Sequence, residues 1–178
     1  MKIKADVSHW VTRAVIGLNL CPFAKSVYVK GKIHYSVSDA TTPDAALQSL
    51  EQELQNLINF GNDSNDTTLL ILPNVLQDYF DYNNFIFFAE LLLEKMGLSG
   101  VIQIATFHPN YQFKGTKKND IDNYTNRSPY PILHLLQEAS ISRVVDAFPQ
   151  TADIYQRNIY TLRCLGIDGW TEWMQREI

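Results

Sequence analysis

The side chains best suited to chemistry gather in one stretch of the sequence, between Phe107 and Pro131. An imidazole, His108, comes first, and a guanidinium, Arg127, lies near the end of the stretch. A histidine works as a general acid or base near neutral pH, and an arginine holds carboxylates and phosphates through two parallel hydrogen bonds. The stretch therefore predicts a site for an anionic small molecule, with His108 as its catalytic residue.

Further polar residues of the stretch are suited to orienting such a ligand. They are Asn110, Tyr111, Asn126 and Ser128. Ser128 followed by Pro129 is typical of a helix start, with the serine as N-cap and the proline at the first helical position. The free backbone N–H groups of that helix end would attract an anion beside Arg127.

Structural roles compete with these functional ones. If Arg127 pairs with Asp120 or Asp122, its role would be to stabilise the loop and not to bind a ligand. His108 would order the chain if it bonds to loop carbonyls. His134 lies at helical spacing among leucines, which favours a packing role.

Other kinds of site find little support in the sequence. Cys21 has apolar neighbours and is best explained as a buried packing residue. If Arg13 or Lys25 lies close to it, the positive charge would lower the pKa of the thiol and make it reactive. No metal-binding spacing of histidine, cysteine or carboxylate residues occurs, so no metal site is predicted. Glycine-rich nucleotide motifs and the nucleophile elbow are absent as well, and the cofactor stays undefined.

Strand and helix patterns alternate along the chain and position this stretch at one edge of a sheet. They predict a helix over 6–20, a strand over 32–38, a helix over 43–60, a strand over 67–72, a helix over 78–96, a strand over 101–107, and helices over 129–139, 140–148 and 150–165. We predict an α/β fold: a helix, a βαβαβ core with a three- or four-stranded, mainly parallel sheet, and a C-terminal helical segment. A fourth strand could lie at Ser26 to Val29, and an antiparallel α+β sandwich remains an alternative.

Ligands of an open parallel sheet bind beyond the carboxyl ends of its strands. The residues that follow the three predicted strands are polar, among them Ser38, Asp39, Asn74 and His108. The third connection runs roughly 20 residues without a regular pattern, and loops of that length in compact domains are usually functional or disordered. Its aromatic residues favour order.

Composition and charge limit the class of protein. The chain has 178 residues, 46% of them hydrophobic, with 15 Lys+Arg against 19 Asp+Glu and only two cysteines. These numbers indicate a single globular domain over 1–178 that needs no disulfides. A net charge of -4 argues against nucleic acid as a partner, and no apolar stretch is long enough to span a membrane. The N-terminus lacks the apolar region of a signal peptide, so we expect a cytoplasmic protein.

Three segments resemble an uncharacterised, mostly bacterial family, domain of unknown function 1415. They are Leu18 to Ala24 (LNLCPFA), Thr106 to Phe113 (TFHPNYQF) and Thr125 to Leu136 (TNRSPYPILHLL). The resemblance spans about residues 7 to 165. It implies an intact domain and carries no activity, cofactor or catalytic residue.

Two functions from different classes fit these observations. One is a small cytoplasmic enzyme that acts on a carboxylate or phosphate compound at the carboxyl edge of the sheet. The other is a non-catalytic module that binds a metabolite or a protein, with the aromatic stretch Tyr79 to Phe88 forming an interface. An enzyme needs His108 and a second polar group to converge in a concave pocket, whereas a protein-binding module shows an exposed apolar patch. The oligomeric state is left open by the sequence.

Overall fold

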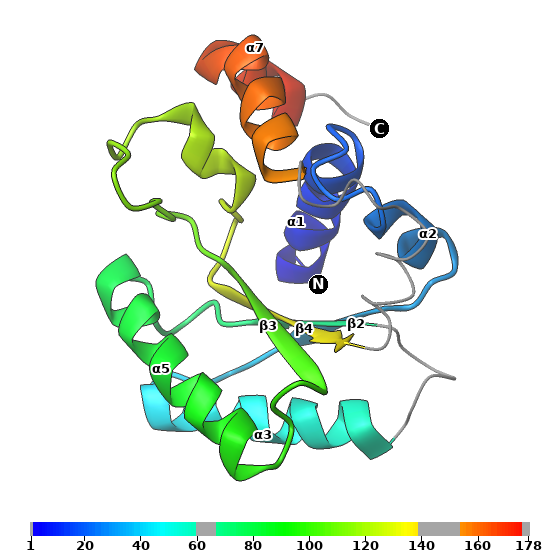
Figure 1. Cartoon of the computed structure of the whole chain (residues 1–178), viewed down its shortest axis with the longest axis vertical. Coiled ribbons are helices and arrows are strands. Elements are labelled where there is room, and N and C mark those ends of the chain that lie inside the picture. The colour runs from blue at the N-terminus through cyan, green and yellow to red at the C-terminus, as the bar shows by residue number, and fades with distance from the viewer. Residues whose placement is uncertain (1, 60–66, 139–153, 176–178) are drawn as a thin grey trace.

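A four-stranded sheet forms the centre of the molecule, with helices on both of its faces (Figure 1). The structure is a computed structural model that describes residues 2–59, 67–138 and 154–175. Its strands are β1 (Ile33–Val37), β2 (Thr67–Ile71), β3 (Ile102–Phe107) and β4 (Ile132–Gln137), in the spatial order β1-β2-β4-β3.

Strands β1, β2 and β3 run in one direction, and β4 runs against them. The β1–β2 pair is parallel, while β4 is antiparallel to β2 and to β3, with Ile71 and Phe107 both opposite Ile132. The carboxyl ends of β1, β2 and β3 therefore meet at one edge, where the loop before β4 also lies. The predicted α/β class is confirmed. The sheet is mostly antiparallel, however, and not mainly parallel as expected, because β4 is inserted between β2 and β3 and pairs antiparallel with both.

Two local predictions about the sheet are wrong. The helix expected over 129–139 is the strand β4, and the strand considered at Ser26 to Val29 belongs to the short helix α2 (Ala24–Val29). A fourth strand exists, but it comes last in the sequence and lies between two earlier strands.

Helices α3 (Pro43–Asn59) and α5 (Tyr79–Lys95) cover one face of the sheet. Thr42 caps α3 by accepting a hydrogen bond from the Ala45 N–H at 3.3 Å. Leucines and alanine spaced three to four residues apart bury the inner face of α3: Ala46, Leu50, Leu54 and Leu57. They pack against Leu70, Leu133 and Ile104 of the sheet in one hydrophobic core.

Helices α1 (Lys2–Trp10) and α7 (Ile154–Gln175) cover the opposite face, together with a π-helical turn, η1 (Val11–Ile16). A second core lies here and includes Val7, Trp10, Ile71 and Leu162. Helix α7 bends at Gly166, whose φ of 67° lies in the left-handed region that glycine tolerates. The sequence predicts a helix end at this glycine, whereas the chain resumes helical geometry and continues to Gln175.

The predicted helix over 140–148 and the start of the one over 150–165 lie outside the described residues. Within the described part of the chain, no helix is long and apolar enough to cross a membrane.

Candidate functional site

The stretch that carries the predicted site forms an ordered loop of residues 108–131 at the carboxyl edge of the sheet. We call it the edge loop. It contains one 3₁₀ helix, η2 (Ile121–Thr125). Its two ends are held together at the sheet: the His108 N–H donates to Asn126 O within the loop at 3.2 Å, and the N–H of Leu72, the residue after β2, donates to Pro131 O at 2.9 Å. The predicted convergence of segments at this edge is therefore present.

His108 is completely buried, and both ring nitrogens have partners within the protein. Nδ1 accepts the Asn110 backbone N–H at 3.0 Å, so Nε2 carries the proton and donates it to Leu76 O at 3.0 Å. Leu76 has a φ of 58°, a conformation that a leucine rarely adopts and that this bond helps to hold. Burial lowers the pKa of the imidazole. His108 thus joins the loop after β2 to the loop after β3, and neither nitrogen is left for a substrate.

Tyrosines from α5 and the edge loop surround His108. The rings of Tyr82 and Tyr79 lie 4.9 and 5.4 Å from the imidazole between centroids, and Tyr111 packs on Tyr79 at 5.3 Å. The Tyr82 hydroxyl donates to Ile132 O at 2.7 Å. Asn110 contributes its backbone to His108, and the residue is exposed. The arrangement is a packed aromatic wall without an open polar centre.

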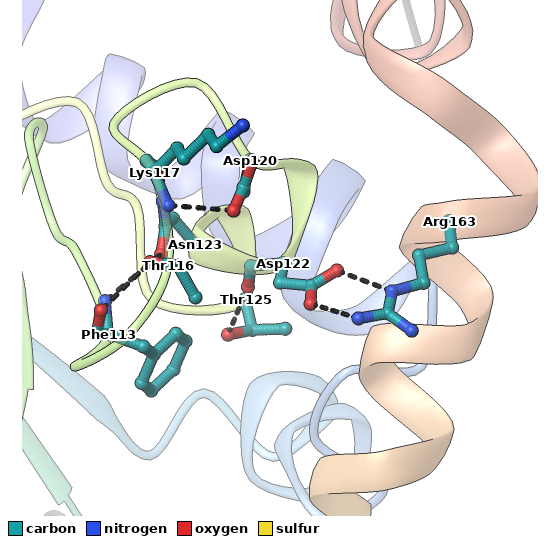
Figure 2. Close-up of polar contacts among 8 residues, drawn as sticks. All are labelled: Phe113, Thr116, Lys117, Asp120, Asp122, Asn123, Thr125 and Arg163. Carbon is teal, nitrogen blue, oxygen red and sulfur yellow. Dashed lines mark hydrogen bonds and ion pairs between the residues drawn. The ribbon is translucent and has the colours of Figure 1, made fainter.

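Asn123, which the sequence did not single out, organises the middle of the edge loop (Figure 2). Its Oδ1 accepts the Phe113 N–H at 3.0 Å and the Thr116 hydroxyl at 2.7 Å, and its Nδ2 donates to Lys117 O at 2.8 Å. Asp120 accepts the Lys117 N–H at 2.7 Å. These bonds replace regular secondary structure and explain why so long a loop is ordered.

An ion pair joins the edge loop to α7. Figure 2 shows the carboxylate of Asp122 facing the guanidinium of Arg163, with Nε–Oδ1 and Nη2–Oδ2 distances of 2.9 and 2.7 Å. This two-pronged geometry is the strong form of an arginine–carboxylate contact, and it raises the pKa of Arg163. The structural alternative considered above paired Arg127 with Asp120 or Asp122. The partner of Asp122 is instead Arg163, which lies 41 residues away in the sequence.

Arg127 is held by the loop backbone. Its Nε donates to Tyr111 O at 3.3 Å, its Nη2 donates to Lys118 O, and its guanidinium lies 4.4 Å from the centroid of the Tyr124 ring. A planar guanidinium fixed on two carbonyls and an aromatic face has lost most of its rotational freedom. Three N–H groups of the guanidinium are not used by these two bonds, since an arginine has five.

No helix begins at Ser128. Its hydroxyl donates to Tyr130 O at 2.6 Å, and β4 follows at Ile132, so the prediction of a helix N-terminus beside Arg127 is wrong. Asn126 is also a structural residue, because its Nδ2 donates to Thr106 O at 3.1 Å and its Oδ1 accepts the Thr125 hydroxyl at 3.0 Å. An anion at this loop would be held by side chains, without a helix dipole.

A second polar region lies where β1 ends against α3. It is an open depression of about 580 Å³ whose polar lining includes Ser36, Ser38, Asp39, Gln48, Ser49, Gln52 and Glu53. Ser36 donates to Glu53 Oε1 at 2.9 Å, and His34 Nε2 lies 3.6 Å from Glu53 Oε2. Two carboxylates and bonded hydroxyls make this depression unsuited to an anion. The sequence did identify Ser38 and Asp39 as edge residues.

The remaining candidates behave as packing residues. His134 is half-buried, and its Nε2 bonds to Thr67 Oγ1. Because the Thr67 hydroxyl donates to Leu135 O at 3.0 Å, Nε2 is the donor in this bond. Burial raises the pKa of the Cys21 thiol, which opposes thiolate formation. Among the described residues, no group of three His, Cys, Asp or Glu side chains could hold a metal ion.

The fold and the loop together define a class of protein: a three-layer α/β protein with an arginine-bearing, internally bonded loop at the carboxyl edge of its sheet. The chain belongs to the family described as Protein of unknown function (DUF1415), whose model matches residues 2–172. The resemblance of the motifs around Cys21, His108 and Arg127 is thereby confirmed. No curated protein and no solved structure matches the chain.

Proposed function

We propose that the protein is a cytoplasmic binding protein for a small carboxylate or phosphate compound, which it holds on Arg127 at the edge loop. The observation that carries this proposal is the fixed guanidinium of Arg127, whose Nε and Nη2 are bonded to Tyr111 O and Lys118 O. A donor that is already immobile loses little entropy when it binds a ligand. Its remaining N–H groups match the two oxygens of a carboxylate or phosphate.

The charge of the edge loop supports an anionic ligand. The loop contains Lys114, Lys117, Lys118 and Arg127 against two aspartates, in a chain of net charge -4. Both aspartates are engaged within the protein, Asp120 by a backbone N–H and Asp122 by Arg163. The loop thus presents excess positive charge on an otherwise acidic protein, which steers small anions to it.

Between the enzyme and the binding protein, the bonds of His108 favour the binding protein. An acid or base must exchange a proton with its substrate, and a buried imidazole with both nitrogens bonded to the backbone is poorly placed to do so. His108 then acts as a support for the loop. Cys21 and Cys164 are both unpaired, which fits the reducing cytoplasm.

The test is to titrate the protein with inorganic phosphate and with citrate at constant ionic strength and to measure the affinity by isothermal titration calorimetry. Arg127→Lys keeps the charge but loses the planar fork, and should weaken binding at least several-fold. Arg157→Gln removes an exposed arginine of α7 and serves as the matched control, with affinity unchanged. Equal affinities for the native chain and Arg127→Lys, or no binding of either anion at millimolar concentration, would refute the proposal.

A further inference from the structure

Helix α5 exposes an apolar stripe on the side that faces away from the sheet. Four large side chains on it are in water: Phe80 is 72%, Phe87 63%, Phe88 53% and Leu91 44% exposed. Their spacing places them on the face opposite the buried Tyr82, Phe85 and Ala89. We call these four residues the α5 stripe.

The size of the stripe marks it as an interaction surface. Taking about 200 Å² for a whole aromatic side chain, it leaves roughly 450 Å² of apolar surface in water. That is comparable to the largest apolar patch of a typical monomer, which is often functional. Scattered exposed hydrophobic residues need no explanation, but four on one helix face do.

Two charges on one flank of the stripe indicate its occupant, whereas the exposed Glu90 and Glu94 lie on the other flank. Asp81, Phe88 and Lys95 follow one another at intervals of seven residues, so they lie along one flank of α5. All three are exposed. Phe88 stands midway between an acidic residue at one end of the helix and a basic residue at the other. A helix with this pattern is complementary to itself when the second copy runs antiparallel.

We propose that α5 pairs with α5 of a second copy of this chain, antiparallel, about a two-fold axis at Phe88. A two-fold axis brings identical patches together, so Phe87 and Phe88 meet their counterparts at the centre. Asp81 of each copy then lies opposite Lys95 of the other. A parallel pair would place Asp81 against Asp81 and Lys95 against Lys95, which is repulsive.

The expected dimer is reversible. Two stripes bury roughly 900 Å² of apolar surface, and stable interfaces bury about 1,200–2,000 Å² in total, so polar rim contacts must supply the rest. We therefore expect dissociation in the micromolar range. The proposal is independent of the edge loop, because no residue of the α5 stripe belongs to it.

Sedimentation equilibrium of the purified chain tests the surface. Between about 1 μM and about 500 μM, a range around micromolar affinity, the mass should rise from the 20.4 kDa of one chain toward twice that value. Phe87→Ser and Phe88→Ser should each weaken the dimer at least tenfold. Tyr160→Ser, which removes a ring on α7 that is 71% exposed, is the control and should leave it unchanged. A single chain at every concentration, or a dimer indifferent to both serine variants, would overturn the proposal.

A charge exchange tests the orientation. Asp81→Lys and Lys95→Asp should each weaken self-association, because each variant places like charges opposite one another. An equimolar mixture of the two variants should associate more tightly than either alone, since both pairs then become opposite in sign. A mixture no tighter than its components would exclude the antiparallel pairing even if a dimer forms. Phosphate binding can be measured on the monomeric Phe88→Ser variant, so the test of the edge loop does not depend on the test of the dimer.

Discussion

At the scale of single residues, His134 makes the stability of the protein depend on pH. Its Nε2–H donates to Thr67 Oγ1 on the sheet, and burial of the ring lowers the pKa of the imidazole to about 4. A histidine of the unfolded chain has a pKa of about 6.5. Between these values the unfolded state binds more protons, so the free energy of unfolding falls as the pH falls.

The contribution should be fully present above pH 6.5 and lost progressively toward pH 4, by roughly 3 kcal/mol at most. Carboxylates also titrate at the lower end of this window, so the comparison is made with His134→Gln, which keeps an N–H donor for Thr67 and does not titrate. Urea unfolding at several pH values should show a shallower decline for the variant. Parallel declines would mean that His134 is not held neutral in the fold.

The two cysteines should differ in reactivity toward a thiol reagent. Cys21 is partly covered and burial raises its pKa, whereas Cys164 lies exposed on α7. One equivalent should react quickly in the native protein, and the second only when the chain unfolds. The variant Cys164→Ser identifies which thiol is which. Fast labelling of Cys21 in this variant would contradict the packing role.

At the scale of elements, the cap of α5 is Asp78. Its carboxylate accepts the N–H groups of Phe80 and Asp81 at 2.8 and 3.2 Å. Asp78→Ala should lower the free energy of unfolding by about 1 kcal/mol, measured by chemical denaturation. Asp168→Ala, at an exposed position of α7, should change it by less than about 0.5 kcal/mol. Similar effects of the two variants would show that the cap does not stabilise α5.

The contrast between the helix α5 and the strand β4 shows what the sequence can predict about elements. Helix α3 and strands β1 and β3 carry periodic patterns in the sequence, whereas α5 and β2 are more uniformly apolar and are predictable from their lengths and from the turn residues that bound them. The segment of β4 is apolar at Ile132, Leu133, Leu135 and Leu136, so it shows no simple two-residue alternation. Such a segment looks the same in a buried strand and in a buried helix. The sequence Ser128-Pro129 before it is typical of a helix start and therefore favoured a helix, whereas the segment is a strand.

At the scale of the whole molecule, the Asp122–Arg163 pair fixes α7 to the edge loop. Asp122 is 8% exposed, so its charge depends on this partner more than a surface carboxylate would. Asp122→Asn and Arg163→Gln should each lower the melting temperature by about 2–4 °C. The double variant should lose less than the sum of the two, because both remove the same contact. Strict additivity would mean that the pair does not stabilise the docking of α7.

The sequence predicts where the candidate site lies in the fold, but not the role of each of its residues. A long loop that begins with His108 directly after a strand and carries Arg127 near its end was correctly predicted to lie at the edge of the sheet. The roles changed because hydrogen-bond partners come from distant segments: Leu76 for His108, and Arg163 for Asp122. Asn123 left no signal at all, since a buried asparagine has the same turn-like neighbours in sequence as an exposed one.

The position of β4 between β2 and β3 has a consequence for synthesis on the ribosome. Among the described residues, β3 pairs in the sheet with β4 alone, which begins at residue 132 and ends at residue 137. At about 5–20 residues per second, β3 leaves the ribosome a few seconds before its partner is available. During that interval the nascent chain exposes an unpaired, apolar strand edge, which is the kind of surface that chaperones cover. We therefore expect the nascent chain to be prone to aggregation while residues 108–137 are synthesised, until β4 pairs with β3.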